Sequence, residues 1–157
     1  FEDLGRNHVA RKAADWARAH LIVAPLAGHT FRPNDVLTRA PASGWVWRFL
    51  DRPPSGPVDP TPGGDDVDRA TAVTWLWEAA GSPVVTLPSG YTDVGGTPHE
   101  MAAAWAQDFA LFTDNPPPTF GADLPVLRAQ FVRALYRLAQ RPAAWDPSIT
   151  PPDTVLF

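Results

Sequence analysis

The chain has 157 residues, of which 45 % are apolar, and this length suits one domain with its own core rather than two. Its net charge is −4 and its only lysine is Lys12, so it lacks the basic face that binding to nucleic-acid phosphates requires. It has no cysteine, which excludes a disulfide framework and thiolate metal sites. No run approaches the roughly 18 consecutive apolar residues of a membrane helix. We therefore expect no nucleic-acid partner and no membrane span.

Helical periodicity dominates the sequence. In residues 8–21, Val9, Ala13, Trp16 and Ala17 fall on one stripe at helical spacing. The same periodicity predicts further helices at residues 38–51, 68–80, 98–112 and 126–140. Most of the 19 prolines fall between these segments, which suits stiff connections. Residues 84–87 are the only β-like run and are too short to carry a sheet, so we expect an all-α fold.

The chain repeats itself, with residues 1–51 matching residues 91–140. In both copies a Trp-Ala pair precedes a Thr-Phe pair by the same interval. An Arg-Ala pair follows the Phe after eight residues, and an aromatic residue follows the Arg after eight more. Repeats at a fixed interval indicate a repeated helix–loop–helix unit. The matched positions are Trp16 and Trp105, Phe31 and Phe120, Arg39 and Arg128, Trp47 and Tyr136, and Asp3 and Asp93.

A third, partial copy lies between the two full ones. Asp68-Arg69-Ala70 leads to Trp77 at the same step of eight residues, but the sequence before it contains no match to the first helix. The middle copy has therefore kept only its second half. We expect a single domain over residues 1–157. It comprises repeat one (1–51), a linker (52–66), the partial repeat (67–81), the last repeat (91–140) and a Pro-rich tail (141–157).

Repeat one carries a set of short motifs in a fixed order. Phe-x-Asp-Leu opens the chain, and a helix with Trp-Ala follows. Residues 30–35 read Thr-Phe-Arg-Pro-Asn-Asp, residues 37–40 read Leu-Thr-Arg-Ala, and residues 47–50 read Trp-Arg-Phe-Leu. This set resembles the S-layer homology (SLH) motif. The resemblance is strong for repeat one, good for the last repeat and partial in the middle.

Membership of the SLH family would imply both a fold and a function. Three motifs assemble in that family into a pseudo-threefold helical bundle, with the Arg-bearing helices at its centre. Grooves between the repeats bind an acidic, often pyruvylated, secondary cell-wall polysaccharide and so anchor exported proteins. The resemblance therefore implies an extracellular, non-catalytic module at the cell wall or cell surface. The chain opens at Phe1, without a methionine, and we expect that an upstream segment was cleaved, trimmed or left out.

The candidate ligand-binding residues are Arg39, Arg69 and Arg128, which stand at the starts of the second helices. A helix N-terminus presents unpaired N–H groups and a positive dipole end, and arginine adds a planar fork suited to a carboxylate. Three copies around an axis would give a multivalent site for an acidic polymer. The alternative is that these arginines pair with nearby carboxylates such as Asp35 and Asp123.

Residues beside these arginines are expected to cap the helices and to shape the loop of the groove. Thr38 and Asp68 are expected to cap their helices, while Asn34 and Asp35 are expected to shape the groove loop. The family pattern Thr-Arg-Ala-Glu/Gln is complete in no copy. Pro41 replaces the acid in repeat one, Thr71 stands there in the partial repeat, and the last repeat has Gln130 but Leu127 in place of the Thr.

Seven tryptophans could serve the core or a ligand. Those in matched register are expected in the core, namely Trp16, Trp47, Trp77 and Trp105. Trp45 and Trp145 are out of register, and we expect them at the surface as possible contacts for a glycan or another subunit.

The sequence contains no motif that indicates an enzyme, a cofactor or a resident metal. His-Glu-x-x-His, Gly-x-Ser-x-Gly and phosphate-binding glycine loops are absent, and the four histidines share no metal-ligand spacing. Besides glycan anchoring, a second hypothesis stays open. The degenerate repeats could instead be a structural subunit that packs against copies of itself or other surface proteins in a layer or filament.

Overall fold

The structure of the chain, a computed structural model, describes residues 1–50, 65–114 and 118–141. These residues form five α-helices and no β-sheet, which confirms the all-α prediction. A 3₁₀ turn, η1 (Ala27–His29), lies in the first loop, and residues 84–87 form no strand. The helices are α1 (Arg11–Ala19), α2 (Arg39–Phe49), α3 (Arg69–Ala79), α4 (Glu100–Asp108) and α5 (Arg128–Ala139).

The first helix of each full repeat ends earlier than its apolar pattern predicts. Leu21 and Ala110, just past α1 and α4, adopt left-handed φ angles of 59° and 51°. The next residue then donates its N–H back to the helix, from Ile22 to Ala17 at 2.8 Å and from Leu111 to Ala106 at 2.9 Å. This is the hydrogen-bond pattern of a Schellman C-cap, which turns the chain while keeping the following apolar residue buried.

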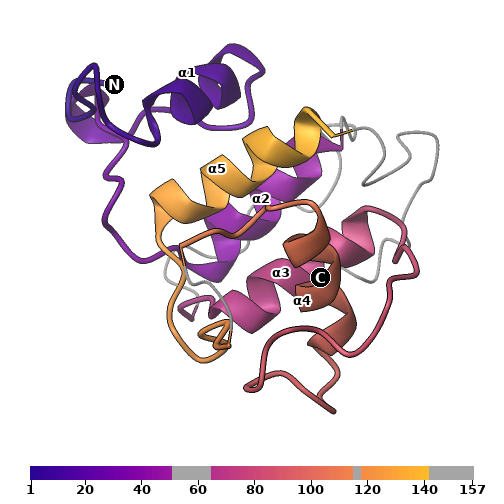
Figure 1. The fold of residues 1–157 in the computed structure, drawn as a ribbon. Coiled ribbons are helices and arrows are strands. Elements are labelled where there is room, and N and C mark those ends of the chain that lie inside the picture. The colour runs from indigo at the N-terminus through magenta and orange to yellow at the C-terminus, as the bar shows by residue number, and fades with distance from the viewer. Residues whose placement is uncertain (51–64, 115–117, 142–157) are drawn as a thin grey trace.

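Each first helix packs against the second helix of a different part of the chain (Figure 1). Helix α1 lies along α5, where the rings of Trp16 and Tyr136 are 5.5 Å apart. Helix α4 lies against α3, where Thr74 Oγ1 and His99 Nδ1 are 2.8 Å apart. Helix α2 contacts both α3 and α5. The buried faces of α1 and α4 consist mainly of alanine, which lets each helix approach its neighbour closely.

Three backbone hydrogen bonds form a closed ring at the starts of α2, α3 and α5. The Leu37 N–H donates to the Val126 carbonyl at 2.8 Å, and the Val126 N–H donates to the Val67 carbonyl at 2.8 Å. The Val67 N–H completes the ring by donating to the Leu37 carbonyl at 3.0 Å. All three residues are buried, so each bond satisfies groups that water cannot reach. The ring brings three helix N-termini to one place.

A second set of three hydrogen bonds lies next to the first ring, at the first residue of each helix. The backbone N–H groups of the three starting arginines donate to carbonyls of neighbouring segments. The bonds are Arg39 to Asp65 (3.0 Å), Arg69 to Leu124 (2.9 Å) and Arg128 to Asp35 (3.0 Å). One of the four unpaired N–H groups at each helix start is thereby satisfied by another part of the chain.

An aspartate near the start of each full repeat holds the loop that leads to its second helix. Asp3 accepts hydrogen bonds from the N–H groups of Phe31 and Arg32, at 2.7 and 2.6 Å. Asp93 accepts them from Phe120, Gly121 and Ala122, at 2.8 to 2.9 Å. Partial burial raises the pKa of each carboxyl, but the hydrogen bonds outweigh it and hold the pKa below the ordinary value.

Replacing Asp93 with alanine should lower the free energy of unfolding by about 1–2 kcal/mol, because three loop N–H groups lose a charged acceptor. Urea unfolding followed by circular dichroism measures this loss. Asp108→Ala removes the same charge from an exposed position at the end of α4 and should change stability by less than about 0.5 kcal/mol. Equal effects of the two substitutions would contradict this role for Asp93.

The same contacts predict a pH dependence. A carboxyl whose pKa is lowered by folding stabilises fully above its unfolded pKa of about 3.9, and that stability is lost as the pH falls through the folded pKa. The stability difference between wild type and Asp93→Ala should therefore be constant above about pH 5 and shrink below about pH 4. Urea titrations across this range measure the difference, and one that stays constant into strong acid would refute the assignment.

Candidate functional site

Helices α2, α3 and α5 each begin at one of the three predicted arginines, and the ring and the second set of hydrogen bonds hold these starts together. The side chains lie in different surroundings. Arg69 is 1 % exposed and Arg128 is 7 % exposed, whereas Arg39 is exposed. Identical positions in the repeat therefore give two buried cations and one accessible cation.

The two buried arginines hold the loop of a neighbouring repeat by the same contacts. Arg128 donates from Nε to the Phe31 carbonyl at 2.8 Å, and its guanidinium lies 5.1 Å from the Phe31 ring and 4.9 Å from the Trp45 ring. Such cation–π contacts are strongest where water is excluded. Arg128 thus joins the last repeat to repeat one.

Arg69 joins the partial repeat to the last repeat in the same way. Its Nε donates to the Phe120 carbonyl at 2.9 Å, and its guanidinium lies 4.9 Å from the Phe120 ring and 5.3 Å from the Phe112 ring. Its two terminal nitrogens are buried and have no hydrogen-bond partner in the part of the chain that the structure describes. Burial lowers the pKa of both Arg69 and Arg128, because it disfavours the charged form.

Arg39 forms only part of this arrangement. Its guanidinium lies 5.1 Å from the ring of Trp75, which stands six residues after Arg69, as Trp45 stands six residues after Arg39. Within residues 1–50, 65–114 and 118–141, its side chain donates no hydrogen bond to a loop carbonyl. The segment from 51 to 64 contains no Phe, Tyr or Trp, so it cannot provide a counterpart of Phe31 or Phe120.

The second residue of each helix shows the same asymmetry. The Ala129 N–H donates to the Pro33 carbonyl at 3.0 Å, and the Ala70 N–H donates to the Ala122 carbonyl at 3.1 Å. No carbonyl among the described residues accepts from the matching N–H of Ala40. At α2, therefore, no oxygen among the described residues accepts from the Arg39 guanidinium or the Ala40 N–H, whereas the matching donors at α3 and α5 each have a carbonyl acceptor. We call this place, with the Trp75 ring beneath it, the α2 junction.

The predicted caps behave differently from one another. Asp68 accepts from the Thr71 N–H at 2.7 Å and caps α3 as predicted. Thr38 occupies the N-cap position of α2, but its side chain makes no capping bond, so that prediction is wrong. At α5, Gln130 supplies the cap by accepting from the Leu127 N–H at 2.9 Å.

The loop residues predicted to shape a groove lie at the surface. Asn34 and Asp35 are exposed, and the Asp35 carbonyl accepts the Arg128 N–H in the second set of hydrogen bonds. The Asp35 carboxylate lies 4.0 Å from Arg32, and no ion pair joins Asp35 or Asp123 to the three starting arginines within the described residues.

One of the predictions about the tryptophans, that Trp45 lies at the surface, is wrong. Trp105 is fully buried, and Trp16, Trp47 and Trp77 pack against the core. Trp45, predicted at the surface, is 3 % exposed, because it stacks between Phe31 at 6.0 Å and Phe131 at 6.2 Å. Trp145 lies outside the described residues.

The sequence could not single out the loop contacts that hold the arginines. The acceptors are main-chain carbonyls, which any residue carries, and only the constant spacing between Phe and Arg in both repeats pointed to these positions. The described residues contain no group of three or more His, Asp or Glu side chains arranged to hold a metal ion. Within the same ranges, no helix has the length and apolar character needed to cross a membrane.

No family model matches the chain, and no curated protein matches its sequence.

Arg128→Ala should lower the free energy of unfolding by about 2–4 kcal/mol, because it leaves a cavity and removes the donor to the Phe31 carbonyl. Arg39→Ala removes the same side chain from the matching but exposed position, and should cost less than about 0.5 kcal/mol. Urea unfolding of both variants measures the difference. Comparable losses would show that Arg39 is also structural.

Proposed function

We propose that this chain is an SLH-like module that binds an acidic cell-wall polysaccharide and so anchors an exported protein at the cell surface. We also propose that its helices follow the pseudo-threefold arrangement of that family. The closed ring of Leu37, Val67 and Val126 supports this arrangement, because each residue bonds to the next by the same backbone contact.

The observation that carries the proposed function is the pair of donors at the α2 junction. At the other two helix starts, the arginine side chain and the following N–H hold two carbonyl oxygens of a neighbouring loop. At α2, no carbonyl of the described residues accepts from the matching donors of Arg39 and Ala40. A carboxylate carries two oxygens on one planar group and can accept from both donors at once. A carboxylate of the polysaccharide would thus take the place of the two loop carbonyls.

The chemistry of the α2 junction favours the binding of an anion, but with modest affinity. The positive end of the α2 dipole and the guanidinium of Arg39 both attract a carboxylate. Asp65 and Asp66 also lie at this junction, as partners of Arg39 and Thr38, and repel it. We therefore expect modest affinity for one carboxylate, with retention at the wall strengthened by the many repeats of the polymer.

Of the three arginines expected to bind the glycan, we assign the ligand to Arg39. Arg69 and Arg128 are buried and already donate to loop carbonyls, so their substitution would disturb the fold before it reported on binding. A triple substitution would mix the two effects, whereas Arg39 alone separates them.

The second hypothesis, a self-assembling structural subunit, rests on the missing half of the middle repeat. Helix α1 covers α5 and α4 covers α3, but no helix among the described residues takes the corresponding place on α2. A second copy or another surface protein could supply a helix there. Sedimentation velocity separates the hypotheses, since this one requires an oligomer at micromolar concentration without glycan.

The test is co-sedimentation of the purified chain with peptidoglycan sacculi, with and without their acid-labile secondary polymers. Arg39→Ala should weaken binding about tenfold, because a charge-assisted contact to the carboxylate is lost. Arg6→Ala removes the same side chain from an exposed turn and should bind like wild type. Both variants should remain as stable as wild type.

Three results would count against the proposal. Equal binding with and without the secondary polymer would exclude that polymer as ligand. Unchanged binding by Arg39→Ala would move the site away from the α2 junction. Absence of binding to intact sacculi, together with an oligomer in solution, would favour the structural-subunit hypothesis.

A further inference from the structure

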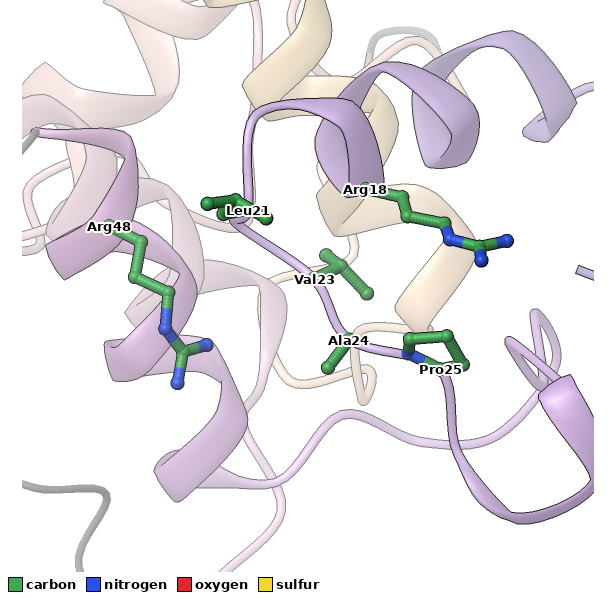
Figure 2. A pocket seen from close by; sticks show the side chains of 6 residues that line it. All are labelled: Arg18, Leu21, Val23, Ala24, Pro25 and Arg48. Atoms are coloured by element: carbon green, nitrogen blue, oxygen red, sulfur yellow. The ribbon is translucent and has the colours of Figure 1, made fainter.

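A hollow of about 370 Å³ opens on repeat one, between the end of α1 and the end of α2. Arg18 reaches it from α1 and Arg48 from α2, on opposite sides of residues 21–25 (Figure 2). The remaining lining is apolar, and its described residues include no acid. The volume falls within the range of small-ligand sites. The apolar lining residues are Leu21, Val23, Ala24 and Pro25.

The walls of this hollow are held by contacts within the protein. Arg48 donates from Nη1 to the Ile22 carbonyl at 3.1 Å, which fixes α2 against the segment that follows α1. Arg18 is exposed, and its guanidinium lies 5.7 Å from the ring of Phe1. Arg18 is therefore held near the hollow by an aromatic face, which leaves its N–H groups able to turn toward a ligand.

The last repeat shows what distinguishes this place in repeat one. There Arg137 matches Arg48 and donates to the Leu111 carbonyl at 3.0 Å. Beside it, Asp114 accepts a hydrogen bond from Arg133 at 3.0 Å. Burial lowers the pKa of Arg137, and the negative charge of Asp114 partly opposes this by raising that pKa. The last repeat thus supplies its own carboxylate at this place.

Repeat one has no acid at the position that matches Asp114. At the same sequence offset, Pro25 stands in the place of Asp114 and Gly44 in the place of Arg133. Arg18 meanwhile replaces Gln107, which adds a positive charge. At these matched positions, repeat one therefore has one acid and one bulky side chain fewer than the last repeat, and one additional cation, Arg18.

We propose that this hollow is a second binding site, which takes a small organic anion bearing a carboxylate or a phosphate. The anionic group lies against Arg18, on the side where Asp114 supplies a carboxylate in the last repeat, and the body of the ligand rests on the apolar lining. The charge of Arg18 favours an anion over a neutral molecule of the same size. The site shares no residue with the α2 junction and does not depend on the proposed function.

The test is an NMR titration of the full chain, labelled with ¹⁵N, with three probes that share one sugar ring. Glucuronate carries a carboxylate, glucose 6-phosphate carries a phosphate, and glucose is neutral. Saturable shift changes at residues 18–25 and 46–50 are expected with one or both anions and not with glucose. The tighter anion identifies which of the two groups the site prefers.

Two substitutions taken from the last repeat test the assignment. Arg18→Gln introduces the residue found at the matching position and should weaken anion binding about tenfold. Pro25→Asp introduces the carboxylate found in the last repeat and should weaken anion binding by at least as much as Arg18→Gln. Arg6→Gln removes a charge from an exposed turn, and Arg39→Gln removes the donor of the α2 junction; both should leave these shifts unchanged.

Several outcomes would overturn the proposal. They are the absence of saturable shifts with both anions, equal shifts with glucose, and undiminished binding by Arg18→Gln. If the shifts disappear in Arg39→Gln but persist in Arg18→Gln, the anion binds at the α2 junction alone. If the chain does not bind sacculi but the shifts at residues 18–25 are retained, the anion site at the hollow is supported and the proposed glycan site at the α2 junction is not.

Discussion

The closed ring of hydrogen bonds between Leu37, Val67 and Val126 is the constraint on which the rest of the structure depends. It joins three segments that are far apart in the sequence, and each donates to one neighbour and accepts from the other. Because the groups are buried, breaking one bond would leave a donor and an acceptor unsatisfied. The positions of α2, α3 and α5, and of the arginines that begin them, follow from this ring.

Two of those arginines have become part of the core. Burying a guanidinium costs solvation energy, which hydrogen bonds and aromatic faces offset. Arg128 meets this condition through the Phe31 carbonyl and two rings. Arg69 meets it less completely, because its terminal nitrogens lack acceptors within the described ranges. A residue type that suggests ligand binding in a sequence can therefore serve mainly to join repeats.

The loss of half a repeat gives the third arginine a different role. The loops before α2 and α5, which contain Phe31 and Phe120, occupy the donors of Arg128 and Arg69. Among the described residues, no loop carbonyl accepts from the side chain of Arg39, and residues 51–64 contain no Phe, Tyr or Trp. Arg39 is consequently the exposed member of the set, resting on Trp75. Degeneration of a repeat can thus open a binding site where complete repeats would fill it, and our proposed function depends on this asymmetry.

The helices and the repeat could be predicted from the amino-acid sequence, because both depend on the spacing of side chains. The apolar periodicity predicted the five helices of the described residues, and the equal intervals from Trp16 to Arg39 and from Trp105 to Arg128 predicted matching units. The sequence could not determine the exposure of Arg39, Arg69 and Arg128, which occupy equivalent positions. That depended on whether another segment's carbonyl reached each guanidinium. Trp45 was misplaced for the same reason, since its burial comes from Phe31 and Phe131 across the fold. Main-chain acceptors and long-range stacking leave no mark on local sequence, so only the tertiary structure decided which arginine can meet a ligand.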